Sequence, residues 1–366
     1  MFDDCLIMAG GSGTRLWPAS SSRLPKQFLP ASGRKSFFSL AVERALALTG
    51  SNGRVIIITG KSHIPHVIAD AAKLKNDEKE RLIVIGEPAA KNTAPAAACA
   101  VVYSLLGGGS RNMIALTSDH IIKPLKVFKA DAALAAASAK KGKLAVFGIP
   151  PARPETGYGY IETGKAEKGV FNVAAFHEKP DAQTAKKYAA NRRFFWNSGM
   201  FAFSTGFMAE QLRRLAPDVI LPFEKLKAPK PESYVTEENI RILNAWSGLD
   251  GAYRKTQSIS IDYAVTEKCP NIVMVRANFE WIDIGNWEEY VKICGNKSNV
   301  YSVSAETCHV DSDIPVALAG VEDLIVVIRS GKNGAPAAAL VTRKGQTEKV
   351  RKIVDQIRKE GRTELL

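Results

Sequence analysis

Short apolar runs alternate with longer alanine-rich stretches along most of this chain. The apolar runs are typical of buried strands, and they comprise residues 5–8, 55–58, 82–85, 113–116, 144–147 and 272–275. The alanine-rich stretches have helical character, and examples are residues 39–48, 95–106 and 127–139. Strands that alternate with helices predict an α/β fold with a Rossmann-like, mostly parallel sheet and helices on both of its faces.

The pattern changes near residue 293. Residues 299–328 are strand-like and poor in glycine. Residues 346–359 follow, and their apolar positions recur at the spacing of an amphipathic helix, namely Val350, Ile353, Val354 and Ile357. We therefore predict a large α/β domain over residues 1–292 and a small β-rich domain over residues 293–366, which ends in that amphipathic helix.

Composition restricts the class of protein. Of the 366 residues, 46% are hydrophobic and 24% are charged, as in ordinary globular domains. The five cysteines are scattered and form no Cys-x-x-Cys pair, so they predict reduced thiols rather than a disulfide framework or a zinc site. The chain lacks an apolar stretch long enough to span a membrane, and its first residues are acidic rather than basic. We expect a cytoplasmic protein without a membrane partner.

The formal net charge of +13 is compatible with nucleic acid, anionic membranes or small polyanionic substrates. The basic residues are spread along the chain, and no motif of a nucleic-acid-binding fold is evident. We expect the positive charge to attract phosphorylated substrates and expect no nucleic acid partner. Salt-sensitive binding to a generic duplex would favour the nucleic-acid alternative.

The most informative chemical motif follows the first apolar run. Gly10, Gly11 and Gly13 lie within four residues, and Arg15 and Lys26 come shortly after them. Backbone N–H groups in such a turn form an anion cradle, to which the two cations add charge, so a nucleoside triphosphate is the expected ligand. The spacing differs from that of a P-loop and does not complete the Rossmann fingerprint. An ordinary glycine-rich strand-to-helix turn is the alternative.

Two acidic residues are candidates for a magnesium site. Asp119 ends an apolar strand, and Asp283 lies between two tryptophans in Trp281–Trp287. Mg²⁺ in proteins is held by one or two carboxylates together with phosphate oxygens and waters. The alternatives are that Asp119 caps a turn and that Asp283 belongs to a structured turn, with Asp262 competing for the metal role.

Weaker signals come from four further segments. Gly157 lies in a glycine–aromatic loop that allows a sugar ring to approach, and Asn197 offers an amide to sugar hydroxyls. Lys179 is suited to neutralise a sugar phosphate or the reacting phosphate, although a surface lysine before a proline is the simpler interpretation. Asn92 and Thr93 begin a helix as caps, and their loop is also suited to bind a base.

Taken together and in this order, these segments resemble the nucleotidyl-sugar pyrophosphorylases. The matching segments are residues 10–18, 25–28, 91–95, 118–120, 155–161, 178–180, 196–201, 260–268 and 281–287. The strings Asn-Thr-Ala-Pro, Trp-Asn-Ser-Gly-Met-Phe and Ser-Ile-Asp-Tyr-Ala-Val are similar to the branch of the family that handles mannose. The departures, such as Thr117-Ser118 in place of Pro-Ala and His177 in place of Val, remove no charged group.

The resemblance implies that GTP and mannose 1-phosphate react to give GDP-mannose and pyrophosphate, by in-line attack of the sugar phosphate on the α-phosphate. It implies nucleotide-binding roles for Gly10, Gly11, Ser12, Gly13, Thr14, Arg15, Asn92 and Thr93. It implies catalytic roles for Arg15, Lys26, Asp119 and Asp283, with Mg²⁺ as the cofactor held by Asp119 and Asp283. It assigns the sugar phosphate to Gly157, Glu178, Lys179 and Asn197.

The resemblance also implies that the C-terminal domain is like a short left-handed β-helix and forms the contacts of a homodimer. Two alternatives remain for the function. One is a pyrophosphorylase for another nucleoside triphosphate and hexose 1-phosphate. The other is a non-catalytic regulatory homologue that binds a nucleotide-sugar.

Overall fold

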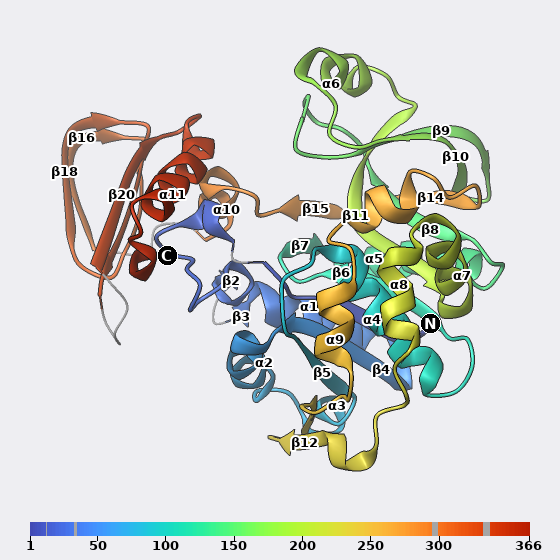
Figure 1. Cartoon of the computed structure of the whole chain (residues 1–366). Coiled ribbons are helices and arrows are strands. Elements are labelled where there is room, and N and C mark those ends of the chain that lie inside the picture. Colours follow the sequence, from blue (N-terminus) through green and yellow to red (C-terminus); the bar gives the residue numbers. More distant parts are fainter. Residues whose placement is uncertain (12, 33–34, 295–298, 332–336) are drawn as a thin grey trace. The chain divides into compact units, whose positions relative to one another are not determined.

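The computed structural model describes the chain except for residues 12, 33–34, 295–298 and 332–336 (Figure 1). The chain divides into two compact units. The first unit consists of Met1–Gly10, Ala41–Ser118 and Ile122–Trp281. The second consists of Gly11–Leu40, Asp119–Ile121 and Ile282–Leu366, so it combines the C-terminal region with two earlier segments. The predicted domain boundary after residue 292 stays a prediction, and each unit is described by itself.

An eleven-stranded sheet forms the centre of the first unit, in the order β12-β13-β5-β4-β1-β6-β11-β8-β14-β10-β9. The first five strands in the chain that join it are β1 (Phe2–Met8), β4 (Thr49–Gly60), β5 (Leu82–Glu87), β6 (Asn112–Thr117) and β8 (Leu144–Ile149). The others are β9 (Tyr160–Glu167), β10 (Val170–His177), β11 (Phe194–Ser204), β12 (Tyr234–Glu237), β13 (Ile240–Leu243) and β14 (Ile272–Arg276). All but β10, β11 and β12 run in one direction, which confirms the mostly parallel sheet.

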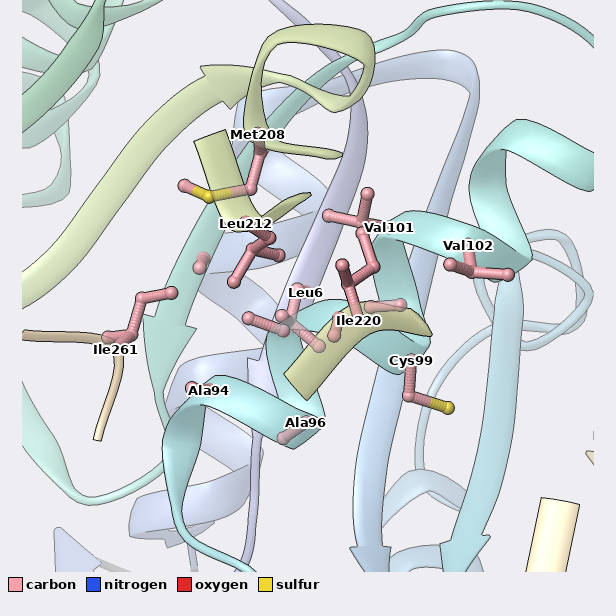
Figure 2. Close-up of a cluster of buried hydrophobic side chains, with 14 of the residues drawn as sticks. Leu6, Ala94, Ala96, Cys99, Val101, Val102, Met208, Leu212, Ile220 and Ile261 are labelled. Carbon is pink, nitrogen blue, oxygen red and sulfur yellow. The ribbon is translucent and has the colours of Figure 1, made fainter. Parts of the chain in front are cut away.

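Helices cover one face of this sheet and bury the larger core. They are α4 (Thr93–Leu106), α7 (Thr205–Leu215), α8 (Pro217–Glu224) and α9 (Leu249–Lys255). Figure 2 shows Leu6 of β1 beneath side chains of α4, α7 and α8, including Cys99, Leu212 and Ile220. The alanines of α4 are almost fully buried, because their small side chains let the backbones of the neighbouring helices and strands approach closely.

The opposite face is covered by α5 (Leu125–Ala139). Its Phe128 packs on Phe147 of β8 and on Phe279, with ring centroids 5.8 and 4.9 Å apart. Because successive residues of a strand point to opposite faces, Val146 joins the α4 side while Phe147 joins the α5 side. Helices therefore flank both faces of the sheet, and the predicted α/β class is confirmed. The remaining helices of this unit are α2 (Ile64–Ala71), α3 (Asn76–Lys79) and α6 (Ala182–Ala189), while α1 (Phe37–Leu48) joins the two units along the chain.

A buried carboxylate ties the beginning of β1 to its neighbours. The side chain of Asp4 is fully buried and lies 2.7 Å from Arg54 Nη2 and 3.1 Å from Arg111 Nε. It also accepts a hydrogen bond of 2.6 Å from the hydroxyl of Ser104 on α4. The two guanidinium groups and the hydroxyl compensate the cost of removing this charge from water.

The second unit is rich in strands after residue 299. Strands β16 (Val300–Glu306) and β18 (Val316–Glu322) pair in parallel, as do β17 (His309–Ser312) and β19 (Leu324–Ser330), and β20 (Ala337–Arg343) adds antiparallel to β19. Its helices are α10 (Trp287–Cys294) and α11 (Val350–Lys359). The strand-rich C-terminal region and the amphipathic helix, with Val350 and Val354 buried, are confirmed. The left-handed β-helix character stays a prediction.

The core of the second unit joins residues from opposite ends of the chain. Trp17 and Trp287 belong to one buried cluster, which also contains Val350 and Val354 of α11. The indole of Trp287 donates to the carbonyl oxygen of Trp17 at 3.0 Å, and the indole of Trp17 donates to the carbonyl oxygen of Leu365 at 2.7 Å. The segment that follows the glycine turn is therefore held by C-terminal residues.

Candidate active site

The glycine turn has a conformation that requires glycine. In the second unit, Gly11 and Gly13 have φ angles of +93° and +61°, which disfavour residues with a side chain. A Cβ atom on Gly13 would lie 2.2 Å from the Cβ atom of Lys26, so only glycine lets Lys26 approach this turn. Thr14 and Arg15 follow in a single 3₁₀ turn, Thr14–Leu16. Ser12 lies outside the described residues, and Gly10 belongs to the first unit.

Lys26 and the two predicted metal-binding acids lie together in the second unit. The Nζ atom of Lys26 is 2.6 Å from Oδ2 of Asp119 and 3.9 Å from Oδ1 of Asp283, and it donates to the carbonyl oxygen of Ile284 at 2.6 Å. Burial alone would lower the pKa of Lys26, but Asp119 and Asp283 outweigh burial and raise the pKa above its ordinary value. Burial would raise the pKa of Asp119, whereas Lys26 and then His120 lower it below its usual range. The site therefore holds a charged lysine and an ionised Asp119.

His120 and Arg15 complete this polar cluster. The Nε2 atom of His120 is 3.8 Å from a carboxylate oxygen of Asp119 and 3.8 Å from one of Asp283. A Cβ atom on Gly285 would lie 3.5 Å from Nη1 of Arg15 and 3.8 Å from Oδ2 of Asp283, so the guanidinium and this acid both lie beside Gly285. Three cationic or imidazole side chains thus surround two carboxylates.

The donor atoms of Asp119, His120 and Asp283 all lie within 4.8 Å of one another. No other group of three such residues in the described part of the chain meets this condition. Two carboxylates fit the oxygen preference of Mg²⁺, which usually takes one or two protein carboxylates. The residues present therefore fit a magnesium ion, and Asp262, the competing acid, is not part of the group.

Three of the four residues predicted to bind the sugar phosphate form a second cluster, within the first unit. Asn197 of β11 donates from its Nδ2 atom to Oδ1 of Asp262 at 2.9 Å. Glu178 has a buried side chain that pairs with Lys179, whose φ angle is +46°. A Cβ atom on Gly159 would lie 2.5 Å from Oε2 of Glu178, so the carboxylate approaches the backbone closely at this glycine. Asn197, Glu178 and Lys179 are thus brought together with Asp262.

The charged groups in this second cluster shift one another's pKa values. Burial and then the negative charge of Glu178 raise the pKa of Asp262 to about 6, although Lys179 and the Asn197 hydrogen bond oppose this shift. Burial would lower the pKa of Lys179, but Glu178 and then Asp262 raise it. The cluster offers carboxylate acceptors, an amide and one ammonium group, which together match the hydroxyls and the phosphate of a sugar phosphate.

Gly157 lies in a loop beside an aromatic wall rather than against Glu178. Its N–H donates to Oε1 of Glu155 at 3.1 Å. The next residue, Tyr158, packs edge-on against Trp196 and Trp281, with ring centroids 5.4 and 5.3 Å away. The prediction anticipated a glycine–aromatic loop, but Gly159 is the glycine that contacts Glu178 in this structure.

Asn92 and Thr93 have the structural roles that capping predicts. The Asn92 side chain accepts from the N–H of Thr93 at 2.9 Å at the beginning of α4. The Thr93 hydroxyl accepts from the N–H of Ile261 at 2.9 Å and so fixes the segment that leads to Asp262. Their binding roles stay a prediction.

A buried acid from the loop that the sequence suggested for base binding lies at the end of β5. Glu87, the last residue of β5, is 9% exposed, and its Oε1 atom accepts from the Tyr253 hydroxyl at 3.0 Å. A Cβ atom on Gly10 would lie 3.4 Å from Oε2 of Glu87, so this oxygen lies near the beginning of the glycine turn. Burial raises the pKa of Glu87 to about 7, although the Tyr253 hydrogen bond opposes the shift. The signal in the sequence was Gly86-Glu87-Pro88 directly after the apolar run of residues 82–85.

Comparison with known proteins assigns this arrangement to a family. The family model described as nucleotidyl transferase matches residues 4–298, and the chain belongs to this family of enzymes. The chain is 33% identical over 375 residues to the mannose-1-phosphate guanylyltransferase of Escherichia coli K12, covering 98% of this chain and 74% of that protein. It is also 34% identical over 368 residues to the xanthan biosynthesis protein XanB of Xanthomonas campestris pv. campestris B100, with the same coverage of each chain.

A solved structure from Thermus thermophilus, described as a mannose-1-phosphate geranyltransferase, has the same fold. It matches with a TM-score of 0.81 at 27% identity, over 97% of this chain and 99% of that chain. The resemblance drawn from the sequence is therefore confirmed, as are the enzyme class and the fold. No helix among the described residues has the length and hydropathy of a membrane span.

Proposed function

We propose that this enzyme joins GTP and mannose 1-phosphate to give GDP-mannose and pyrophosphate. The observation that carries the proposal is the cluster of Lys26, Asp119 and Asp283, in which the lysine Nζ atom lies 2.6 and 3.9 Å from the two acids. Arg15 lies beside the same cluster. This combination of cations and carboxylates next to a glycine turn suits a nucleoside triphosphate. The proteins described as guanylyltransferases among its relatives support the choice of substrates.

The reaction requires little covalent chemistry from the protein. An oxygen of the sugar phosphate attacks the α-phosphorus of GTP in line, the bond to the β-phosphate breaks, and pyrophosphate leaves. Arg15 and Lys26 neutralise the negative charge that the phosphates bring together, and the backbone of the glycine turn binds the triphosphate. Asp119 and Asp283 would hold Mg²⁺, which when bound supplies further positive charge at the phosphates.

We assign the sugar phosphate to the cluster described within the first unit. Glu178, Asp262 and Asn197 bind the hydroxyls of mannose, and Lys179 neutralises its phosphate. The hydrogen bond of 2.9 Å between Asn197 and Asp262 fixes both side chains before the substrate arrives. Such preorganisation lowers the entropy that is lost when the substrate is positioned.

Glu87 supports guanine as the base. Above its pKa of about 7, Glu87 is a carboxylate and an acceptor with two oxygens, and guanine presents two adjacent donors, N1–H and N2–H₂, on one edge. Adenine presents an acceptor beside a donor on the same edge, so it would leave one carboxylate oxygen opposite a lone pair. Since Glu87 is buried, a mismatched polar group there is costly, and this strengthens the discrimination between bases.

We further propose that the protein forms a homodimer through its C-terminal strands. Large apolar side chains are exposed there, with Tyr301 at 67%, Val303 at 71% and Val341 at 63%. A second copy of the chain that covers these side chains would remove them from water. Light scattering of the purified chain measures the oligomeric state directly, and a monomer at all concentrations contradicts this part of the proposal.

The test of the function is a substrate panel. Pyrophosphate release is measured with GTP, ATP, UTP and dTTP, each paired with mannose, glucose and glucosamine 1-phosphates. We expect the highest kcat/KM for GTP with mannose 1-phosphate. Equal or better turnover with another pair would assign the enzyme to that pair. Binding of GDP-mannose without turnover of any pair would favour the regulatory alternative.

The role of Glu87 is tested in the same panel. Glu87→Gln replaces one acceptor oxygen by a donor, and we expect kcat/KM for GTP to fall by about 10²-fold. The control is Glu162→Gln, which removes a partly exposed carboxylate that pairs with Arg193 at 2.9 Å. An unchanged preference for GTP in Glu87→Gln would remove Glu87 from base recognition while leaving the rest of the proposal intact.

A further inference from the structure

A cavity of about 510 Å³ lies in the first unit, apart from every residue assigned to the substrates above. It is bounded by the residues that follow β4, by Gly86 of β5, by the end of β13 and by α9. Its volume is within the range of pockets that hold small-molecule ligands. Its polar lining consists of Lys61, Asn244, Asp250 and Arg254, and Trp246 lies among them.

The charges around this cavity favour an anion. The side chain of Arg254 is exposed and has no ion pair or hydrogen bond among the residues that the structure describes. Lys61 is paired with Asp250 at 3.0 Å, but both side chains are more than half exposed. An ion pair of this kind contributes little, so Lys61 is free to turn towards a ligand. Two cations thus border a space where one carboxylate and one amide remain to bind hydroxyl groups.

Contacts with neighbouring residues hold Trp246 and Gly86 of the cavity lining in place. The indole of Trp246 donates to the carbonyl oxygen of Lys227 at 2.8 Å, and its ring packs edge-on against Tyr103 at 5.7 Å. A Cβ atom on Gly86 would lie 2.9 Å from Cγ of Lys61, so glycine is what allows β5 and the Lys61 segment to approach each other. A cavity with a fixed floor requires less ordering when a ligand binds.

Helix α9 connects this cavity to the buried acid of β5. Asp250, Gly251 and Arg254 of α9 line the cavity, while Tyr253 of the same helix donates to Glu87 at 3.0 Å. Gly86, which also lines the cavity, directly precedes Glu87 in β5. A ligand that shifts α9 therefore changes the hydrogen bond that orients the Glu87 carboxylate.

We propose that this cavity is a regulatory site for a small phosphate monoester that carries hydroxyl groups, and that its occupancy changes the affinity for the nucleotide through α9. Arg254 and Lys61 bind the phosphate, and Asp250 and Asn244 bind the hydroxyls. The binding step is independent of the substrates. The coupling step rests on the proposed function, because it acts through the acid assigned to guanine.

Binding is tested by calorimetry on the full chain with inorganic phosphate, ribose 5-phosphate and AMP as probes. We expect ribose 5-phosphate or AMP to bind, and Arg254→Gln to weaken that binding at least about tenfold. The control is Lys255→Gln, which removes a neighbouring exposed cation of α9 that does not line the cavity, and it should bind as the unaltered chain does. Preferred binding of AMP or of ribose 5-phosphate identifies the source of the phosphate. Absence of binding by all three probes at millimolar concentration, or equal loss in both variants, overturns the site.

Coupling is tested by measuring the Kd for GTP with and without the bound probe. We expect a change of about fivefold or more. Tyr253 does not line the cavity, so Tyr253→Phe should still bind the probe. Because this variant lacks the hydrogen bond to Glu87, it should no longer show the change in the Kd for GTP. Retention of the full change in Tyr253→Phe, or no change in the unaltered chain, overturns the coupling. If GTP itself does not bind, the proposed function fails, but the calorimetry still decides whether the site exists.

Discussion

The raised pKa of the buried Glu87 carboxyl can be tested quantitatively with the variant Glu87→Gln. The residue is 9% exposed, and burial raises its pKa from 4.5 to about 7. The hydrogen bond from Tyr253 opposes this rise of the pKa but does not cancel it. Glutamine is similar in size and keeps an oxygen to accept that hydrogen bond, but it does not ionise.

The direction of the effect follows from linkage between proton binding and folding. Below about pH 4.5 the carboxyl is protonated in both the folded and the unfolded chain. As the pH rises from there towards 7, the unfolded chain loses this proton while the folded chain keeps it, so the free energy of unfolding falls. The loss is complete above the folded pKa. A shift of about 2.5 units at 1.36 kcal/mol per unit corresponds to roughly 3 kcal/mol.

The measurement compares urea unfolding of the unaltered chain and of Glu87→Gln at several pH values between 5 and 8, followed by tryptophan fluorescence. Relative to the unaltered chain, we expect the variant to become more stable as the pH rises, by about 2.5 kcal/mol between pH 5 and 8, since part of the effect is already present at pH 5. The control Glu162→Gln removes one negative charge and should not reproduce this trend. Parallel pH profiles for the unaltered chain and Glu87→Gln would refute the reasoning, because they would show that Glu87 does not retain its proton on folding.

Four further outcomes test the remaining features. Asp283→Asn should lower kcat by at least about 10², and near-normal kcat there, with a loss in Asp262→Asn, would transfer the metal role to Asp262. Lys179→Ala should raise the KM for mannose 1-phosphate more than that for GTP; the opposite pattern would place Lys179 at the nucleotide. Asp4→Ala leaves two arginines without their buried partner and should lower the free energy of unfolding by about 3 kcal/mol or more, whereas the exposed change Asp77→Ala should have little effect in the same urea titration. Tyr301→Asp places a charge among the exposed apolar side chains and should yield a monomer by light scattering if the dimer forms there.

The local part of the fold was predictable from the sequence. Residues 5–8, 82–85 and 113–116 are unbroken apolar runs, and they form strands buried on both faces because helices cover the sheet on each side. The alternation with helices predicted their parallel direction. The antiparallel insertion of β11 between β6 and β8 was not predictable, because strand order depends on packing between distant segments.

The candidate site, like the fold, was predictable only in part from the sequence. The residue types at 15, 26, 119 and 283 predicted phosphate and metal chemistry, which stays a prediction, and the structure brings these four side chains together. Asp262 was weighed as a second metal ligand, yet it faces Asn197, a contact that only the folded chain shows. Gly159 was quoted within its loop, but its importance depends on the position of Glu178, which no spacing rule gives. Glu87 looks like a strand end in the sequence and becomes chemically distinctive only through burial.

The bonds that hold Trp17 have a consequence for how the enzyme matures. Its indole is anchored by the backbone of Leu365, and its carbonyl oxygen by the indole of Trp287. The ribosome adds these two partners 348 and 270 residues after Trp17. The nascent chain consequently carries Arg15 and Lys26 for most of this interval without the neighbours that fix them, and the segment that bears these two cations reaches its final structure only once the later residues have been made.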